Sequence, residues 1–359
     1  MTVSPTHARH PRGGRLKIPV MPAKAPVYPQ AASILCRKDV DPCAGVTCEA
    51  EVTGGERPSV NRRHARGSGH PLKARRPRLG GAGWTRKLRL RTPEFFGDRI
   101  DMTVLQTPFR LGSTSYVWPD DILPNVRQLG PWVDDVELVL FEVDEYNNLP
   151  DAATLDELNG LAERHDLTYT VHLPLDLALA HAPSLEKALK VIALGRHLAP
   201  WAYVLHLDGR AVEGEPDAAR VACWQEEALR ALDPLAQAVG DPSLLCIENL
   251  ENYCPEQFLP LLDRIPVSLC VDVGHLWLMG RDPVSFLEEH LDRTRVIHLH
   301  GIGERDHQSL LHQDREQVAP VVDLLGGRPY EGVVTLEVFS REDFFPSRSL
   351  VAELANGHH

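Results

Sequence analysis

The chain has 359 residues and divides sharply by charge, because residues 1–101 carry 20 Lys and Arg residues against 8 Asp and Glu residues. The rest of the chain carries 18 basic and 42 acidic side chains. No run approaches the ~20 apolar residues that a membrane span needs, so we expect no membrane protein. Nucleic-acid affinity depends on Lys and Arg, so the acidic charge of residues 102–359 argues against a nucleic-acid partner for that segment.

The basic segment lacks the features of a folded domain. It is rich in Arg, Gly, Pro and Ser and shows no sustained apolar periodicity, which predicts a disordered leader over residues 1–101. Three interpretations compete, namely a nucleic-acid-binding arm, a targeting peptide, and sequence upstream of the true start. Acidic residues, prolines and the lack of an apolar signal region argue against targeting. We expect Met102 to be the biological start and residues 102–359 to form the catalytic domain.

Eight short apolar runs follow in the acidic segment, and most of them end on His, Asp or Glu. A strand that is buried on both faces reads as such a continuous run of Val, Ile and Leu. The runs are Phe109–Tyr116, Val136–Glu142, Leu167–His172, Ala202–His206, Leu244–Glu248, Val267–Asp272, Val296–His300 and Val333–Glu337.

Helical patterns separate these runs. They cover Pro119–Gly130, Pro150–His165, Pro183–Leu198, Pro216–Val239, Pro255–Arg264, Pro283–Leu291 and Glu316–Leu325. Regular alternation of strand and helix over about 250 residues predicts a (β/α)8 TIM barrel of the α/β class. A doubly wound open sheet is the alternative, but the first turn, Gly112–Ser115, lacks the glycine fingerprint of that fold.

Four cysteines lie in the acidic segment, at positions 223, 246, 254 and 270. Cys246 and Cys270 fall inside predicted buried strands, where a free thiol acts as a small apolar group. Their spacing indicates no disulfide framework, so we expect a cytoplasmic protein.

The charged strand ends predict an active site, because a TIM barrel builds its site at the carboxyl ends of its strands. The last four predicted strands end on Glu248, Asp272, His300 and Glu337. Three carboxylates and an imidazole suit Mn²⁺, Zn²⁺ or Co²⁺. Burying these four groups together would be costly unless a cation compensated them.

Further histidines extend this predicted site. His172 and His206 end the third and fourth strands and could hold a second ion, so we expect one or two divalent metal ions per chain. A single histidine at a strand end is more often structural, and only their joint placement favours ligands. His275 lies three residues after Asp272 and can face the same cavity. His298 alternates with His300, which predicts that it points to the other side of its strand.

Four residues are candidates for substrate contact. Tyr116 ends the first predicted strand, and Arg305, Asp306 and His307 lie in the loop after the seventh. Apolar packing of Tyr116 and plain solvent exposure of the other three remain open as alternatives.

The pattern resembles the xylose isomerase-like barrels, also called the AP endonuclease family 2 fold, over residues 109–340. This resemblance implies metal ligands at Glu248, Asp272, His300 and Glu337, with His275 paired to Asp272. The endonuclease branch has additional histidines on strands three and four, which His172 and His206 match. It also has an Asp-x-His pair after strand seven, and the sequence Glu304–His307 departs from that pattern.

Five stretches are similar to one subgroup, the CbiR phosphodiesterases that remodel cobamides. They are Leu111–Tyr116, Asp120–Val126, Asp134–Glu142, Tyr169–Asp176 and His298–Gly301. The resemblance implies hydrolysis of the phosphodiester in the nucleotide loop of a cobamide, a small-molecule substrate, with Glu248 or Glu337 accepting a proton.

Two other activities compete with the phosphodiesterase. A sugar or sugar-phosphate isomerase or epimerase would use the same barrel and metal, with Glu248 and Glu337 as an acid–base pair. It needs no histidine ligands on strands three and four, so His172 and His206 favour the phosphodiesterase. An abasic-site endonuclease is disfavoured by the acidic charge. The sequence leaves the oligomeric state open.

Overall fold

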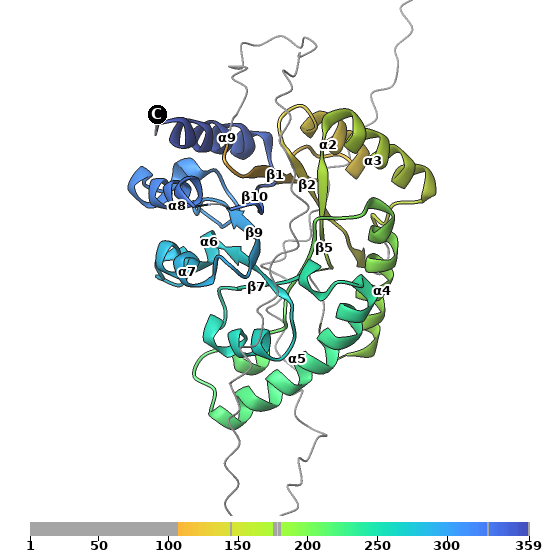
Figure 1. Cartoon of the computed structure of the whole chain (residues 1–359), viewed down its shortest axis with the longest axis vertical. Helices are drawn as coiled ribbons and strands as arrows, with labels where there is room; N and C mark the ends of the chain where they lie inside the picture. Colours follow the sequence, from red (N-terminus) through yellow and green to blue (C-terminus); the bar gives the residue numbers. More distant parts are fainter. Residues whose placement is uncertain (1–106, 144–145, 175–177, 179–180, 329, 358–359) are drawn as a thin grey trace, which may run out of the picture. The chain divides into compact units, whose positions relative to one another are not determined.

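Eight parallel strands close into a barrel in the computed structural model of this chain, which describes residues 107–143, 146–174, 178, 181–328 and 330–357. The predicted leader and Met102 lie outside the described residues. Around the barrel, the strands are β1 (Arg110–Thr114), β10 (Val333–Leu336), β9 (Thr294–Leu299), β8 (Ser268–Asp272), β7 (Leu245–Glu248), β6 (Ala202–Leu205), β5 (Thr168–His172) and β2 (Asp135–Val139). The predicted TIM barrel is confirmed (Figure 1).

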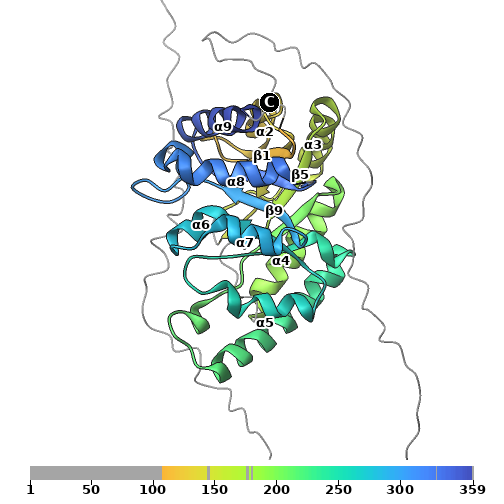
Figure 2. The same cartoon turned by 60° about the vertical axis from the view of Figure 1, so that its left-hand side comes forward.

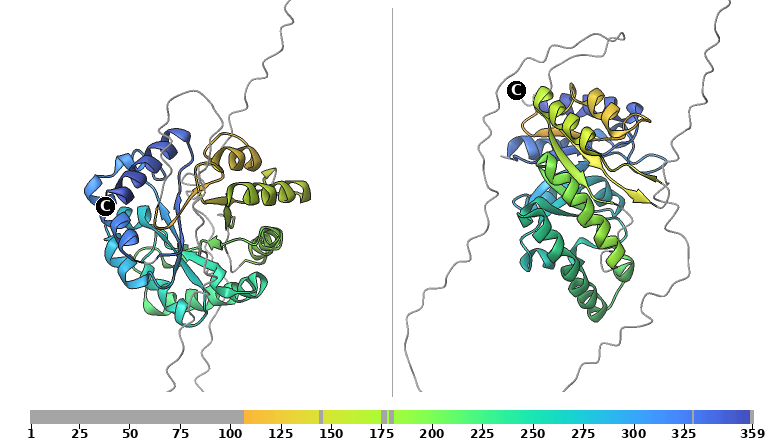
Figure 3. Two further views of the ribbon diagram at one scale, coloured as in Figure 1. Left: turned by 45° about the horizontal axis from the view of Figure 1, so that its top comes forward. Right: turned by 90° about the vertical axis from the view of Figure 1, so that its right-hand side faces the viewer.

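Helices alternate with the strands and lie outside the barrel (Figures 2 and 3). The α-helices are α2 (Ile122–Leu129), α3 (Ala152–His165), α4 (Ala182–Gly195), α5 (Ala218–Val239), α6 (Val273–Leu278), α7 (Pro283–His290), α8 (Arg315–Gly327) and α9 (Arg341–Asn356). Aspartates begin several of them, as where Asp151 and Asp217 accept hydrogen bonds from amides of the first turn. None of the helices in the described part of the chain is long and apolar enough to cross a membrane.

One predicted helix has a different form, and several elements were not predicted, among them the helices α6 and α9 and two short strands. The segment Pro255–Arg264 forms the 3-10 helices η4 (Pro255–Gln257) and η5 (Leu259–Asp263) in place of one α-helix. The remaining 3-10 helices are η1 (Arg196–Leu198), η2 (Arg210–Val212), η3 (Pro242–Leu244) and η6 (Leu310–His312). After β2, the strands β3 (Glu142–Val143) and β4 (Tyr146–Asn147) pair antiparallel.

Side chains along each barrel strand alternate between the apolar core around the barrel and the barrel interior. Side chains such as Leu138, Ile247 and Ile297 belong to the large apolar core, whereas their alternating neighbours face the barrel interior. At the carboxyl ends, these interior positions carry His and acidic side chains. One layer below, Val204, Cys246, Cys270 and Val296 form a separate small apolar cluster. The strand period thus brings the ionisable side chains together above an apolar floor.

The four cysteines at positions 223, 246, 254 and 270 are free, and Cys246 and Cys270 are buried, as predicted for a chain without disulfides in this segment.

Candidate metal centre

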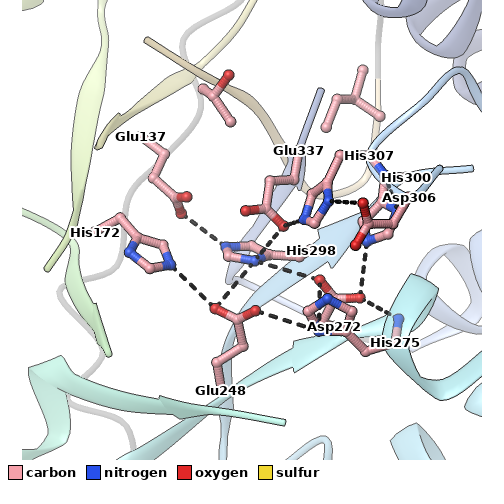
Figure 4. A network of polar contacts seen from close by, with 12 residues as sticks. Glu137, His172, Glu248, Asp272, His275, His298, His300, Asp306, His307 and Glu337 are labelled. Carbon is pink, nitrogen blue, oxygen red and sulfur yellow. Dashed lines mark hydrogen bonds and ion pairs between the residues drawn. The ribbon is translucent and has the colours of Figure 1, made fainter. Parts of the chain in front are cut away.

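Four ionisable side chains from consecutive strands meet at the carboxyl end of the barrel (Figure 4). Glu248 ends β7, Asp272 ends β8, His298 lies within β9, and Glu337 directly follows β10. One ligand atom from each lies within 4.8 Å of those of the others, and all four side chains are buried. We call these four residues the central cluster.

The histidine of the central cluster is His298, which corrects the prediction that this side chain points away from the site. His298 Nδ1 lies 3.0 Å from Glu337 Oε2 and 3.5 Å from Glu248 Oε2. His300 also reaches the site, with Nε2 3.3 Å from Asp272 Oδ1. Side chains two residues apart lie on the same face of a strand, so His298 and His300 both turn toward the site, and the prediction that His298 faces the other side was wrong.

A second group of ligands lies on the other side of Glu248. His172 Nε2 and His206 Nε2 lie 3.2 and 3.1 Å from the same oxygen, Glu248 Oε2. The carbonyl of Leu173 lies 2.8 Å from His172 Nδ1 and can only accept, so Nδ1 carries a proton and Nε2 faces the carboxylate. His172, His206 and Glu248 form the flanking cluster, which shares Glu248 with the central cluster.

A third group shares Asp272 with the central cluster and contains His275, His300 and His307. Asp272 Oδ1 accepts a hydrogen bond from the amide of His275 at 2.7 Å and so caps α6. Gly274 allows this close packing, because a β-carbon there would lie 2.1 Å from His300 Cε1. The predicted pairing of Asp272 with His275 at one site therefore has a structural basis in the turn between them.

The loop after β9 presents His307, for which the sequence left substrate contact and solvent exposure open. Gly301 and Gln308 close this loop with two backbone hydrogen bonds of 2.8 and 3.0 Å. His307 adopts a left-handed backbone with φ of 54°, a conformation found often at functional positions. Its Nε2 lies 3.3 Å from Glu337 Oε2, and its ring stacks on His300 at 4.2 Å. Sequence alone could not show that this loop folds back over the cluster.

The other candidates for substrate contact lie farther from the central cluster. Asp306 contacts His307, with Oδ1 3.2 Å from Nδ1, and this contact lowers the pKa of Asp306 to about 2. Arg305 is exposed and contacts its own loop through the Asp306 carbonyl and Gln308. Tyr116 packs against Phe141, and its hydroxyl accepts a hydrogen bond of 2.6 Å from Asn148. The structure therefore brings Asp306 to the cluster through His307, whereas the described contacts of Arg305 and Tyr116 lie outside it.

Electrostatics favour charged carboxylates in this buried layer. Burial alone would raise the pKa of the Glu248 carboxyl, but three neighbouring histidines hold that pKa well below its ordinary value. Burial would likewise raise the pKa of Glu337, and His298 and His307 hold it well below. Conversely, burial lowers the pKa of His298 and His307, but Cys270 and carboxylates around His298, and carboxylates around His307, raise both pKa values well above the ordinary value.

The residues present fit a divalent metal ion. Asp272 Oδ2, Glu337 Oε2 and His298 Nδ1 are buried and lie near one another, yet none of them makes a hydrogen bond of acceptable geometry with a described residue. Such groups are costly to bury unless a cation compensates them. Carboxylate oxygens and imidazole nitrogens are ligands for Zn²⁺, Mn²⁺ and Co²⁺. The chemistry of the site therefore agrees with the predicted metal cofactor.

Fold and site together define a TIM barrel whose catalytic end carries buried ligands suited to divalent metal ions. The chain belongs to the xylose isomerase-like TIM barrel family, also called AP endonuclease family 2, which it matches over residues 123–356. No curated protein matches the sequence significantly.

Solved structures share the fold at low sequence identity. A D-tagatose 3-epimerase-like protein is 19% identical with a TM-score of 0.57, over 68% of this chain and 96% of its own. An AP endonuclease family 2 protein from Brucella melitensis is 16% identical with a TM-score of 0.51, over 70% and 98%. The E. coli 3-keto-D-glucoside 4-epimerase YcjR is 15% identical with a TM-score of 0.51, over 68% and 98%. These likenesses show the fold.

Proposed function

We propose that this chain is a metal-dependent phosphodiester hydrolase. The observation that carries the proposal is the position of Glu248, whose carboxylate contacts the histidines of the flanking cluster and also belongs to the central cluster. A shared carboxylate between two adjacent ligand sets is suited to a pair of metal ions. Paired ions stabilise both the attacking and the leaving oxygen of an in-line displacement at phosphorus.

The side chains of the site would have two roles in this reaction, namely metal binding and proton transfer. The central and flanking clusters would hold the ions, and bound ions would supply Lewis acidity and lower the pKa of a water molecule. Glu337 lies at the edge of the central cluster between His298 and His307, where it would accept the proton of the attacking water. The new oxygen–phosphorus bond forms as the bond to the leaving oxygen breaks, and that oxygen takes up a proton.

The substrate we propose is the nucleotide loop of a cobamide. The support is the similarity of the sequence around β1, β2, β5 and β9 to the CbiR phosphodiesterases. Hydrolysis would break the bond between phosphorus and the riboside oxygen, giving cobinamide phosphate and the lower-ligand riboside. This substrate is a small molecule, in agreement with the acidic charge of the catalytic segment.

A sugar isomerase or epimerase is the second candidate. Two of the three similar structures described above carry epimerase names, so the structural comparison favours this activity over the phosphodiesterase. The central cluster also supplies what it needs, namely a metal site with Glu248 and Glu337 as an acid–base pair. The histidines of the flanking cluster have no role in this reaction, and for that reason we rank it second.

One assay separates the two candidates. The full chain, loaded with Zn²⁺, Mn²⁺ or Co²⁺ and with bound metal confirmed, is incubated with adenosylcobalamin, and products are identified by mass spectrometry. We expect cobinamide phosphate and α-ribazole. An intact cobamide together with turnover of a ketose or ketose phosphate in a sugar panel would replace the first proposal with the second.

The proposal assigns catalysis to residues 102–359, the predicted catalytic domain. The same assay on that segment, compared with the full chain, tests the assignment. Equal rates would support it, and a folded but inactive segment would show that the leader contributes.

A further inference from the structure

Glu137 is a buried carboxylate that the proposed reaction does not use. It lies on β2 with its side chain fully buried, and it reaches across the barrel interior to the back of His298 (Figure 4). Its Oε2 lies 3.0 Å from His298 Nε2. The sequence contained a signal for this residue, because an acidic side chain interrupts the apolar run that forms the strand.

The contact determines how the imidazole presents its two nitrogens. The Glu137 carboxylate only accepts hydrogen bonds when charged, so the proton of the contact lies on His298 Nε2. The opposite nitrogen, Nδ1, then faces Glu337, Glu248 and Asp272, at 3.0, 3.5 and 3.8 Å. With a cation bound among these carboxylates, Nδ1 would carry no proton and would direct its lone pair at the cation.

We propose that Glu137 is a positioning residue that holds His298 with Nε2–H toward itself and Nδ1 toward the metal ion of the central cluster. Metal-bound histidines generally donate their second N–H to such a partner, which fixes the ring and strengthens the ligand. The inference rests on the metal-binding part of the proposed function, and it names a residue outside the central cluster.

The surroundings of Glu137 favour this role over packing. In strand register, Thr170 lies beside Glu137 and Thr335 lies beside His298. Both hydroxyls are buried without a hydrogen-bond partner in the described ranges, and so is Glu137 Oε1. An apolar side chain at position 137 would fill the same space without the cost of burying a carboxylate, so a purely structural role gives no reason for an acidic residue here.

Two substitutions test the hydrogen bond, and a third serves as a control. Glu137→Met keeps the length of the side chain but removes the acceptor, whereas Glu137→Gln keeps an acceptor oxygen. Asp135→Asn is the matched control, because Asp135 is equally buried two residues earlier on the same strand and contacts Thr168. In the full chain, Zn²⁺ affinity measured by chelator competition should fall about 10–100-fold in Glu137→Met and less in Glu137→Gln. The Asp135→Asn protein should bind Zn²⁺ like the parent.

A second measurement needs no substitution at Glu137. In the zinc-loaded full chain labelled with ¹⁵N-histidine, long-range NMR correlations should show a proton on His298 Nε2 and metal-bound Nδ1. His298→Gln identifies the signal. A proton on Nδ1, or unchanged zinc affinity in a folded Glu137→Met protein, would overturn the inference.

The outcomes separate this inference from the proposed function. If the parent protein binds no zinc, the proposed metal site and the proposed role of Glu137 are both wrong. If the parent binds zinc and cleaves the phosphodiester while Glu137→Met binds equally well, only the role of Glu137 fails. If the parent binds zinc with a proton on His298 Nε2 but cleaves no phosphodiester, the proposed hydrolysis is wrong and the positioning role of Glu137 stands.

Discussion

The barrel interior buries acidic side chains in two successive layers, and the pKa values of the carboxyl groups shift in opposite directions in the two layers. In the lower layer, burial raises the pKa of Asp135 to about 7, and a hydrogen bond from Thr168 offsets only part of this effect. In the upper layer, Glu248 and Glu337 are buried as well, but neighbouring histidines hold the pKa of each well below its ordinary value.

The comparison shows that burial alone does not mark a functional carboxylate. A buried acid beside hydroxyl groups becomes easier to protonate, whereas a buried acid among histidines remains charged and available to a cation. Glu137 shares a feature of each case, because it lies on the same strand as Asp135 but contacts a histidine of the upper layer. The distinction between the layers leads to four predictions.

The largest effect is expected from Glu337→Gln in the upper layer. Loss of the proton acceptor should lower turnover by about 10²–10⁴-fold while the fold remains intact, because the amide keeps the size of the side chain. Steady-state kinetics and circular dichroism measure the two properties, with metal content determined on the same sample. Retained turnover with metal bound would exclude Glu337 from this role.

The second prediction concerns the lower layer. The pKa of Asp135 is raised from 3.8 to about 7, so its contribution to stability is present below the unfolded value and is lost as pH rises through the folded value. Asp135→Asn removes this dependence. Between pH 5 and pH 8, the variant should gain about 2–3 kcal/mol in unfolding free energy relative to the parent. Urea denaturation at both pH values measures this, and parallel curves for the two proteins would contradict it.

The third prediction concerns the cation of the upper layer. A metal ion that binds only the folded chain, supplied at 100 times its Kd, adds about 2.7 kcal/mol of stability. For a barrel of this size, we expect the melting temperature to rise by roughly 5–10 °C. Differential scanning calorimetry with Zn²⁺ and then with excess chelator measures the change. A melting temperature that is insensitive to metal would contradict compensation of the buried carboxylates.

The smallest effect is expected where charges lie in solvent. Arg127 on α2 pairs with Glu157 on α3, and both side chains are substantially exposed. Exposed ion pairs contribute about 0–1 kcal/mol, so Arg127→Met should change the unfolding free energy by no more than that and leave turnover unaltered. A larger loss of unfolding free energy would show that exposed ion pairs also contribute substantially to the stability of this fold.

The sequence predicted the barrel well because strand and helix periods are local properties. It also placed Glu248, Asp272, His172 and His206 correctly at the carboxyl end, since each ends a buried strand. For His298 the prediction was wrong although the strand period was sufficient, because residues two apart share one face of a strand and His298 and His300 therefore both turn toward the site. Glu137 and His307 join the site through contacts with distant strands, and such contacts depend on tertiary structure.

The most direct test of the account is anomalous diffraction from crystals of the full chain grown with Zn²⁺. We predict one zinc peak among Glu248, Asp272, His298 and Glu337, and a second between Glu248 and the pair His172 and His206. Crystals that contain zinc elsewhere but show no peak beside Glu248 would contradict the shared-carboxylate metal centre on which the proposed hydrolysis depends.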